Sequence, residues 1–275
     1  MEAIALGLGL SLAIAGLGFW AGALTPSGFL GAVAVGTLIF GLGGWTWGVL
    51  LILFFVSSSA LTRFRELEKR PLAGKFAKGR RRDLGQTMAN GGVGALLAVA
   101  QALQPNGLWT AAFVGSMAAV NADTWATEVG TLSPIEPRLL STGRRVPAGT
   151  SGAVSPLGTA ASFAGALLIG IAGMALFAVD RLSAGAGSSL KTWALPAGLV
   201  GGLGGSLVDS LLGATVQRVN WCPSCQVETE RAVHDCGTET RHLRGWAWLG
   251  NDAVNGVASA VGAGLGAATY MTLGR

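Results

Sequence analysis

Long apolar segments separated by shorter polar ones dominate the chain. Eight of them approach the roughly 20 residues that a helix needs to cross a hydrocarbon core about 30 Å thick. The segments span about 3–22, 28–43, 45–62, 87–103, 107–125, 157–179, 193–217 and 249–272. The second and third segments are joined only by the Gly43-Gly44 pair, so an alternative is that these two segments form one re-entrant unit. The pattern predicts an all-α polytopic membrane protein with about eight transmembrane helices in a single membrane domain, residues 1–275.

The composition supports this prediction. Hydrophobic residues make up 51% of the chain, charged residues make up 12%, and the mean hydropathy is +0.53. Soluble domains carry about 25% charged residues, and disordered chains have low hydrophobicity. The first basic residue is Arg63, so the N-terminus lacks the basic region of a secretory signal. We therefore expect the first apolar segment to be a retained membrane helix.

The basic residues are distributed unevenly between the apolar segments. Residues 63–86, 126–156 and 218–248 hold 16 of the 19 lysines and arginines, nine of them in 63–86. The other three are Arg181, Lys191 and Arg275. With eight helices the three polar segments fall on one side of the membrane, and the positive-inside rule makes that side cytoplasmic. We expect a multi-pass protein of the cell (inner) membrane. Because this topology already accounts for the basic residues, the net charge of +5 does not indicate a nucleic-acid partner.

Glycine is abundant, with 44 residues, and recurs at helical spacing. Gly201, Gly205 and Gly213 form one such row, and Gly262 and Gly266 form another. Small residues at this spacing allow helices to approach closely in lipid. We expect these faces to pack helices within the chain, and they also offer a surface for a homo-oligomer.

Acidic residues within or at the ends of apolar segments are candidates for chemistry, because a charge in the bilayer is costly unless it is paired, hydrated or bound to a cation. The candidates are Asp123, Glu128, Asp209 and Asp252, with Asn121 and Asn255 nearby. Carboxylate and amide oxygens are ligands for Mg²⁺. The three aspartates all fall toward the predicted cytoplasmic ends of their helices, so a shared Mg²⁺ site is predicted. The alternative is that each acid caps a helix or makes one interhelical hydrogen bond.

Two basic stretches have the features of phosphate-binding sites. Arg80 and Arg81 lead into a predicted helix start that carries Gln86 and Asn90. Arg144 and Arg145 precede the sequence Gly149-Thr150-Ser151-Gly152. Arginines beside a helix N-terminus favour anions, and together with metal carboxylates they suit phosphoryl or nucleotidyl transfer. The alternative is that the positive-inside rule alone accounts for the basic run 63–82.

The third polar segment contains three cysteines within a stretch of 15 residues. Cys222, Cys225, His234 and Cys236 supply the four ligands of a possible structural Zn²⁺ site, and His242 is a substitute ligand. An odd number of cysteines on the predicted cytoplasmic side argues against disulfides. Reduced thiols, or a redox or catalytic role, are the alternatives.

Several short sequences together resemble one integral-membrane family. They are Ser57-Ser58-Ser59, Gln86-x-x-Ala89-Asn90-Gly91-Gly92, Asn121-Ala122-Asp123-Thr124-Trp125-Ala126-Thr127-Glu128-Val129-Gly130, Gly149-Thr150-Ser151-Gly152, Gly205-Ser206-x-x-Asp209-Ser210-x-x-Gly213-Ala214 and Asn251-Asp252-x-x-Asn255. The chain resembles the family that includes plant and cyanobacterial phytyl-phosphate kinases and animal transmembrane protein 19. The Asn-Ala-Asp-Thr-Trp sequence is highly specific. A departure is Ala60-Leu61-Thr62-Arg63, where the family usually has Ser-Lys after the serines.

The resemblance implies a kinase that converts a prenyl (phytyl-like) monophosphate into the diphosphate with a nucleoside triphosphate, CTP being favoured by kinship with CTP-using membrane enzymes. Asp123, Asp209 and Asp252 would be catalytic and would hold Mg²⁺ with Glu128. Nucleotide and substrate phosphates would be bound by the arginines and amides, which are Arg80, Arg81, Gln86, Asn90, Arg144, Arg145, Asn121 and Asn255. A lipid-phosphate cytidylyltransferase is the alternative enzyme, and an ion-coupled transporter is the alternative of another class.

Overall fold

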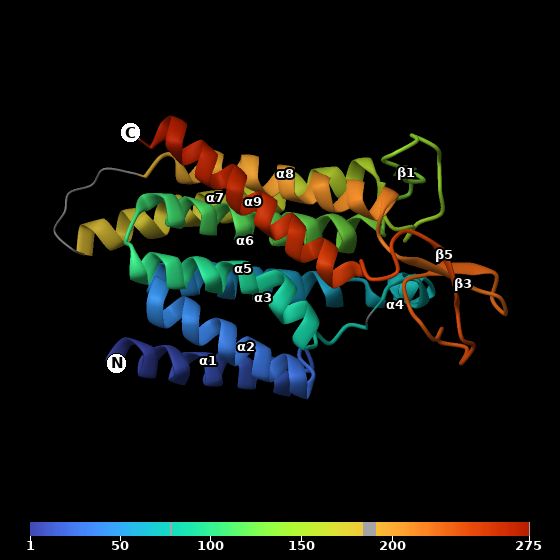
Figure 1. Ribbon diagram of the computed structural model, residues 1–275, viewed down its shortest axis with the longest axis horizontal. Helices are drawn as coiled ribbons and strands as arrows, with labels where there is room; N and C mark the ends of the chain where they lie inside the picture. Colours follow the sequence, from blue (N-terminus) through green and yellow to red (C-terminus); the bar gives the residue numbers. More distant parts are fainter. Residues whose placement is uncertain (78, 184–190, 275) are drawn as a thin grey trace.

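Eight long helices run alongside one another in the computed structural model, which describes residues 1–77, 79–183 and 191–274 (Figure 1). They are α1 (Glu2–Trp20), α2 (Pro26–Leu38) continued by the π-helix η1 (Ile39–Gly43), α3 (Trp45–Arg63), α5 (Leu84–Leu103), α6 (Gly107–Gly130), α7 (Pro156–Ser183), α8 (Ala194–Thr215) and α9 (Asn251–Leu273). Each matches one predicted segment. Lys78 and Arg275, whose charges entered the topology prediction, lie outside the described residues.

The predicted helical membrane fold is confirmed, whereas the number of crossings stays a prediction. Six helices of the described chain are long and apolar enough to cross a membrane, namely α1, α2 with η1, α3, α7, α8 and α9. Helices α5 and α6, which carry the predicted site residues Gln86, Asn90, Asn121, Asp123 and Glu128, are not among them. Gly44, at φ +88°, separates η1 from α3, so the second and third segments form two helices.

Large apolar side chains lie on the outside of the bundle. Leu17, Leu30, Leu96 and Leu207 are all exposed, as side chains that contact lipid would be. On α1 the buried positions are small instead and follow a helical period: Gly7, Ser11, Ala15 and Gly18. Helix α1 therefore buries small residues against its neighbours and turns its leucines outward.

Helix α6 is the core of the second half of the molecule. Its residues from 110 to 122 are all buried, and α7, α8 and α9 pack around it. A Cβ atom added at Gly201 would stand 2.6 Å from Gly115 Cα and 2.7 Å from Gly262 O, so these backbones are in direct contact. The glycine faces thus pack helices within the chain, and the homo-oligomer stays a prediction.

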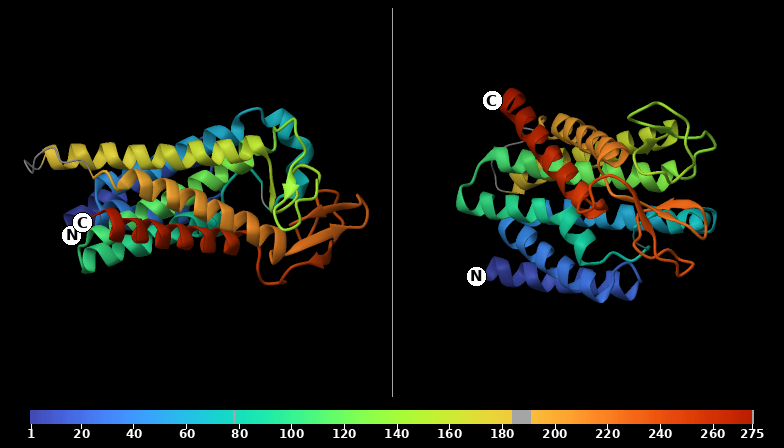
Figure 2. Two further views of the ribbon diagram at one scale, coloured as in Figure 1. Left: turned by 90° about the horizontal axis from the view of Figure 1, so that it is seen from above. Right: turned by 45° about the vertical axis from the view of Figure 1, so that its right-hand side comes forward.

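The three polar segments gather at one end of the bundle, opposite both termini (Figures 1 and 2). Residues 63–86 form the short helices α4 (Glu66–Lys69) and η2 (Arg70–Lys75). The second segment pairs β1 (Arg138–Leu139) with β2 (Ala153–Val154). The third forms a sheet of order β4-β3-β5, from β3 (Val219–Cys222), β4 (Val227–Thr229) and β5 (Arg241–Arg244). All three polar segments thus lie at one end of the bundle, as the charge pattern predicts. The strands in the second and third polar segments were not predicted.

Candidate functional site

Four carboxylates converge at this polar end, and each comes from a different element. Asp123 of α6 and Asp209 of α8 lie within hydrogen-bonding distance of each other. Glu230, which directly follows β4, is close enough to act electrostatically on both. Asp252, in the first turn of α9, acts in turn on Glu230. The structure therefore brings Asp123 and Asp209 together, adds Glu230 near both, and places Asp252 near Glu230.

The Asp123–Asp209 pair concentrates negative charge inside the protein. Asp209 Oδ2 is buried and has no hydrogen-bond partner among the described residues. Two facing carboxylates repel each other at low dielectric unless they share a proton or bind a cation. A hard divalent cation would satisfy both groups, and carboxylate oxygens are its preferred ligands. The donor set at this position therefore fits Mg²⁺.

Glu230 was missed in the sequence, because it stands among the polar residues of the cysteine segment without a recognisable pattern. In the structure it accepts hydrogen bonds from Gln217 Nε2 at 2.6 Å, from Ala77 N at 3.0 Å and from Ser151. Burial raises the pKa of Glu230, and these three hydrogen bonds oppose that rise. Ser151 belongs to the Gly-Thr-Ser-Gly sequence, whose part in the site is thus to orient this carboxylate.

Glu128 does not join the four carboxylates. Its Oε2 pairs with Lys69 Nζ at 2.6 Å, and its Oε1 accepts a hydrogen bond from Thr62 Oγ1 at 2.6 Å. Glu128 stands five positions after Asp123, and this spacing places the two side chains on different faces of α6. Both oxygens of Glu128 are engaged toward α3 and α4, so the structure separates this predicted ligand from the others.

Asn121 also faces α3 rather than the carboxylates. It accepts a hydrogen bond from Ser57 Oγ at 3.1 Å and donates one from Nδ2 to Gly165 O at 2.8 Å. Its side chain is fully buried and ties α6 to α3 and α7. Asn255, by contrast, is half-buried and lies one turn from Asp252 on α9. Only Asn255 of the two amides thus neighbours the carboxylate cluster along its helix.

The predicted phosphate-binding arginines lie on the surface of the polar end. Arg80 pairs with Glu66 at 2.8 Å, and Arg81 donates two hydrogen bonds to Leu24 O at 2.8 and 3.0 Å. Arg144 and Arg145 are exposed in the loop between β1 and β2. All four are accessible to a soluble anion, but within the described part of the chain no contact holds any of them beside the four carboxylates.

Arg82 is half-buried, unlike Arg80, Arg81, Arg144 and Arg145. Its guanidinium donates hydrogen bonds to Ser58 Oγ at 2.8 Å and Ser59 Oγ at 3.1 Å, and it lies over the rings of Phe54 and Phe55. Burial lowers the pKa of Arg82 to about 10, while nearby Glu128 favours the charged form. The group therefore stays cationic at neutral pH. These contacts also give the serine triplet a function, because it anchors this charge.

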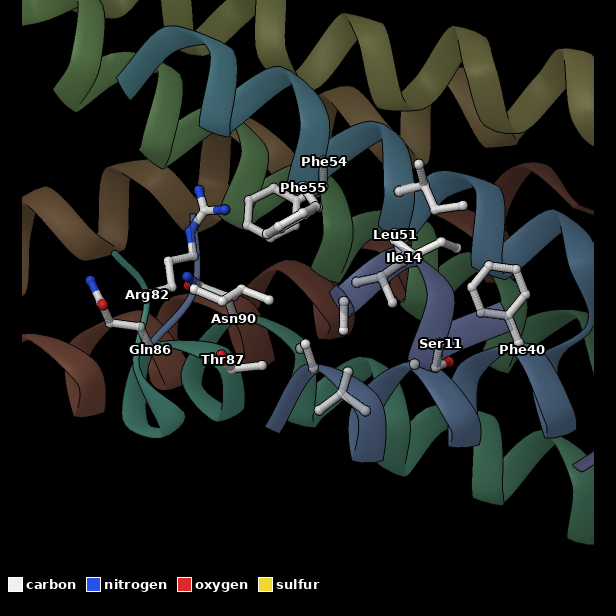
Figure 3. A pocket seen from close by; sticks show the side chains of 17 residues that line it. Ser11, Ile14, Phe40, Leu51, Phe54, Phe55, Arg82, Gln86, Thr87 and Asn90 are labelled. Atoms are coloured by element: carbon white, nitrogen blue, oxygen red, sulfur yellow. The ribbon is translucent and has the colours of Figure 1, made fainter. Parts of the chain in front are cut away.

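Arg82 stands at one end of a cavity between α1, α2, α3 and α5 (Figure 3). Gln86, Thr87 and Asn90 lie at the same end, whereas the rest of the wall is largely apolar. The apolar wall includes Ile14, Ala15, Leu24, Ala32, Val35, Phe40, Leu51, Ile52, Phe54 and Phe55. A cavity with one cationic, amide-rich end and an apolar body suits an amphiphile with an anionic head.

The predicted zinc ligands are also brought together. The ligand atoms of Cys222, Cys225, His234 and Cys236 all lie within 4.8 Å of one another. The other histidine, His242, instead places Nε2 3.0 Å from Gly245 O. This cluster lies in the segment that carries Glu230, and it is separate from the carboxylate site.

Comparisons with known proteins agree with this architecture. Protein PGR of Arabidopsis thaliana is 31% identical over 247 residues, which cover 84% of each chain. Uncharacterised membrane proteins of Methanocaldococcus jannaschii and Synechocystis are 32% and 30% identical, over 71% and 88% of this chain and 75% and 81% of their own. No solved structure matches the chain. Residues 9–263 match the family described as integral membrane protein DUF92, and the chain belongs to this family.

Proposed function

We propose that the protein is a membrane kinase that transfers a phosphoryl group from a nucleoside triphosphate, CTP by preference, to a prenyl monophosphate of the phytyl class. An oxygen of the acceptor phosphate attacks the γ-phosphorus, the bond to the β-phosphate oxygen breaks, and the nucleoside diphosphate leaves. The acceptor is already an anion, so no strong general base is needed. Positioning and charge neutralisation then provide most of the catalysis.

The observation that carries this proposal is the group of facing carboxylates. Asp123, Asp209, Glu230 and Asp252 would hold one or two Mg²⁺ ions, with Asn255 in support. Bound Mg²⁺ supplies charge neutralisation for the triphosphate. The unpartnered Asp209 Oδ2 supports this assignment, because an isolated buried oxygen is costly unless a ligand completes its bonding. Arg80, Arg81, Arg144 and Arg145 would attract the nucleotide to the same end.

The cavity supports the lipid half of the proposal. The prenyl chain would occupy its apolar body, and Arg82, Gln86 and Asn90 would bind the monophosphate at its polar end. Arg82 is well suited because its charge is fixed by two serines and two aromatic rings before the substrate arrives. The positive-inside rule supports a cytoplasmic location for this end of a protein in the cell (inner) membrane.

The test uses purified full-length protein with Mg²⁺, a panel of prenyl monophosphates and CTP labelled at either the γ- or the α-phosphate. The proposal predicts that the γ label moves to a prenyl diphosphate and that CDP is released. Transfer of the α label with release of diphosphate would instead show a cytidylyltransferase. An absence of nucleotide consumption with every acceptor would contradict both enzymes and favour an ion-coupled transporter.

A further inference from the structure

We propose that Cys222, Cys225, His234 and Cys236 bind one Zn²⁺ ion, and that this ion fastens the sheet β4-β3-β5 so that Glu230 is held in the carboxylate cluster. The zinc site stands on its own geometry. Its consequence for Glu230 rests on the proposed function of the carboxylates, and the two parts have separate tests.

The spacing of the ligand atoms is that of a tetrahedral zinc centre. Cys222 Sγ and Cys236 Sγ are 3.6 Å apart, and His234 Nδ1 and Cys236 Sγ are 3.4 Å apart. Zinc bonds of about 2.3 Å to sulfur and about 2.05 Å to nitrogen give tetrahedral separations of about 3.8 Å and 3.5 Å. A disulfide would need sulfur atoms about 2.05 Å apart. The observed separations therefore match metal coordination and exclude a bond between Cys222 and Cys236.

Two tight turns present the ligands in pairs. Cys222 ends β3, and the turn that carries Cys225 closes with a hydrogen bond from Gln226 N to Cys222 O at 2.9 Å. Gln226 has φ +52°, a left-handed conformation that few non-glycine residues adopt. A second turn holds His234 and Cys236, and it closes with a hydrogen bond from Gly237 N to His234 O at 2.9 Å. Opposed turns of this kind bring two pairs of ligands around one ion.

The segment 218–248 has almost no hydrophobic core of its own. The structure describes all of its residues, and Val219 and Cys222 are the hydrophobic side chains buried among them. Small units without a hydrophobic core need a staple such as a disulfide or a metal. The cysteines form no disulfide, so the four-ligand cluster is the available staple.

Hydrogen bonds hold Glu230 and its two neighbours against the first polar segment. Thr229 Oγ1 donates to Gly74 O at 2.7 Å, Glu230 N donates to Lys75 O at 2.9 Å, and Arg231 Nε donates to Phe76 O at 2.9 Å. Three consecutive residues thus fix Glu230 against the first polar segment.

Arg231 joins this anchor to the metal ligands, because it also pairs with Asp235, which lies between His234 and Cys236. Loss of the metal should therefore loosen the contacts that position Glu230.

Metal analysis of full-length protein purified with Zn²⁺ in the growth medium tests the site without any assay of activity. We expect about one zinc per chain in the wild type and near zero in Cys236→Ser and His234→Ala. His242→Ala is the matched control, because the chain has only two histidines and His242 lies outside the ligand cluster. Co²⁺ substitution should give the visible spectrum of a tetrahedral thiolate site. No zinc in the wild type, or unchanged zinc in His234→Ala, would overturn the proposal.

The consequence for Glu230 is tested with Mn²⁺ as a probe of the carboxylates. We expect His234→Ala to weaken Mn²⁺ binding severalfold, and Glu230→Gln to weaken it by a similar factor while it retains its zinc. Normal Mn²⁺ affinity in zinc-free His234→Ala would overturn the fastening role. Failure of every variant to bind Mn²⁺, the wild type included, would instead contradict the proposed function and leave the zinc count as the test of the site.

Discussion

The two halves of the bundle are packed in opposite ways. Helices α6, α7, α8 and α9 approach so closely that Gly115, Gly201 and Gly262 touch through their backbones. Helices α1, α2, α3 and α5 instead enclose the cavity that ends at Arg82. The half made of α6–α9 packs backbone against backbone, and the half made of α1, α2, α3 and α5 encloses an apolar cavity.

This difference follows from what each half would bind. A metal site needs ligands held in one geometry, so its aspartates belong on helices that cannot shift relative to one another. A long flexible chain needs an apolar volume with a polar group at one end. The glycines around Asp209 serve this packing, because Gly205 lies against α6 and α9 while Gly213 lies against Ser151 and Gly152.

The largest expected effect comes from the tightly packed half. Asp123→Asn, Asp209→Asn and Asp252→Asn should each lower phosphoryl transfer at least a hundredfold, since the loss of metal stabilisation costs about 3 kcal/mol or more in the transition state. The measurement is the initial rate with the labelled nucleotide. Glu136→Gln is the control, because this acid is exposed at the same end. Near-normal rates in two of the three variants would break the assignment.

Arg82 should matter most in the other half. Arg82→Gln removes the half-buried cation and should raise the KM for the prenyl monophosphate about tenfold or more, by roughly the 1.5–3 kcal/mol of a charged hydrogen bond. Arg80→Gln changes an exposed arginine paired with Glu66, so its effect should stay within about threefold. Equal effects of the two substitutions would remove the distinction between the cavity and the surface.

Filling the cavity should discriminate between substrates by length. Ala32 lines the apolar wall, and Ala32→Phe should raise the KM for a long prenyl chain several times more than for a short one. Leu96→Phe is the matched control, because Leu96 is exposed on the outside of α5. A uniform loss for all chain lengths would show that the prenyl chain lies elsewhere.

The pH dependence of metal binding tests Glu230. A carboxylate must lose its proton to bind a divalent cation. Burial raises the pKa of Glu230 above the ordinary value of about 4.3, so protons compete at a higher pH than they do at an exposed glutamate. Mn²⁺ affinity should therefore begin to fall at a higher pH, as the pH is lowered, than it would at a site of exposed glutamates. In Glu230→Gln it should start lower and fall less steeply, and parallel curves would contradict the role of this residue.

The smallest expected effect is on stability. Without metal, Asp209→Asn should raise the midpoint of thermal unfolding by about 2–4 °C, because an amide relieves the repulsion from Asp123 and each kcal/mol shifts the midpoint by that amount in a chain of this size. Saturating Mg²⁺ should abolish or reverse the gain, since it stabilises only the wild type. Destabilisation of the metal-free variant would show that the carboxylate pair is structural.

The sequence predicts what depends on local pattern. Apolar length located all eight helices, and the positive charges placed three polar segments at one end. Helical spacing alone could not show which face of α6 each acid occupies, so Glu128 was grouped with Asp123 although it pairs with Lys69. Glu230 and Arg82 depend on tertiary contacts. The first becomes a site residue through the fold of the cysteine segment, and the second becomes half-buried because Ser58 and Ser59 receive it.

The most direct test of the central claim is to titrate the detergent-solubilised protein with Mn²⁺ in the presence of CTP and to record free Mn²⁺ by electron paramagnetic resonance. Mn²⁺ takes the oxygen ligands that Mg²⁺ uses. The account predicts one or two ions per chain in the wild type and in Glu136→Gln, and loss of this binding in Asp209→Asn. Undiminished binding in Asp209→Asn, or none in the wild type, would contradict a divalent-cation site at the four carboxylates.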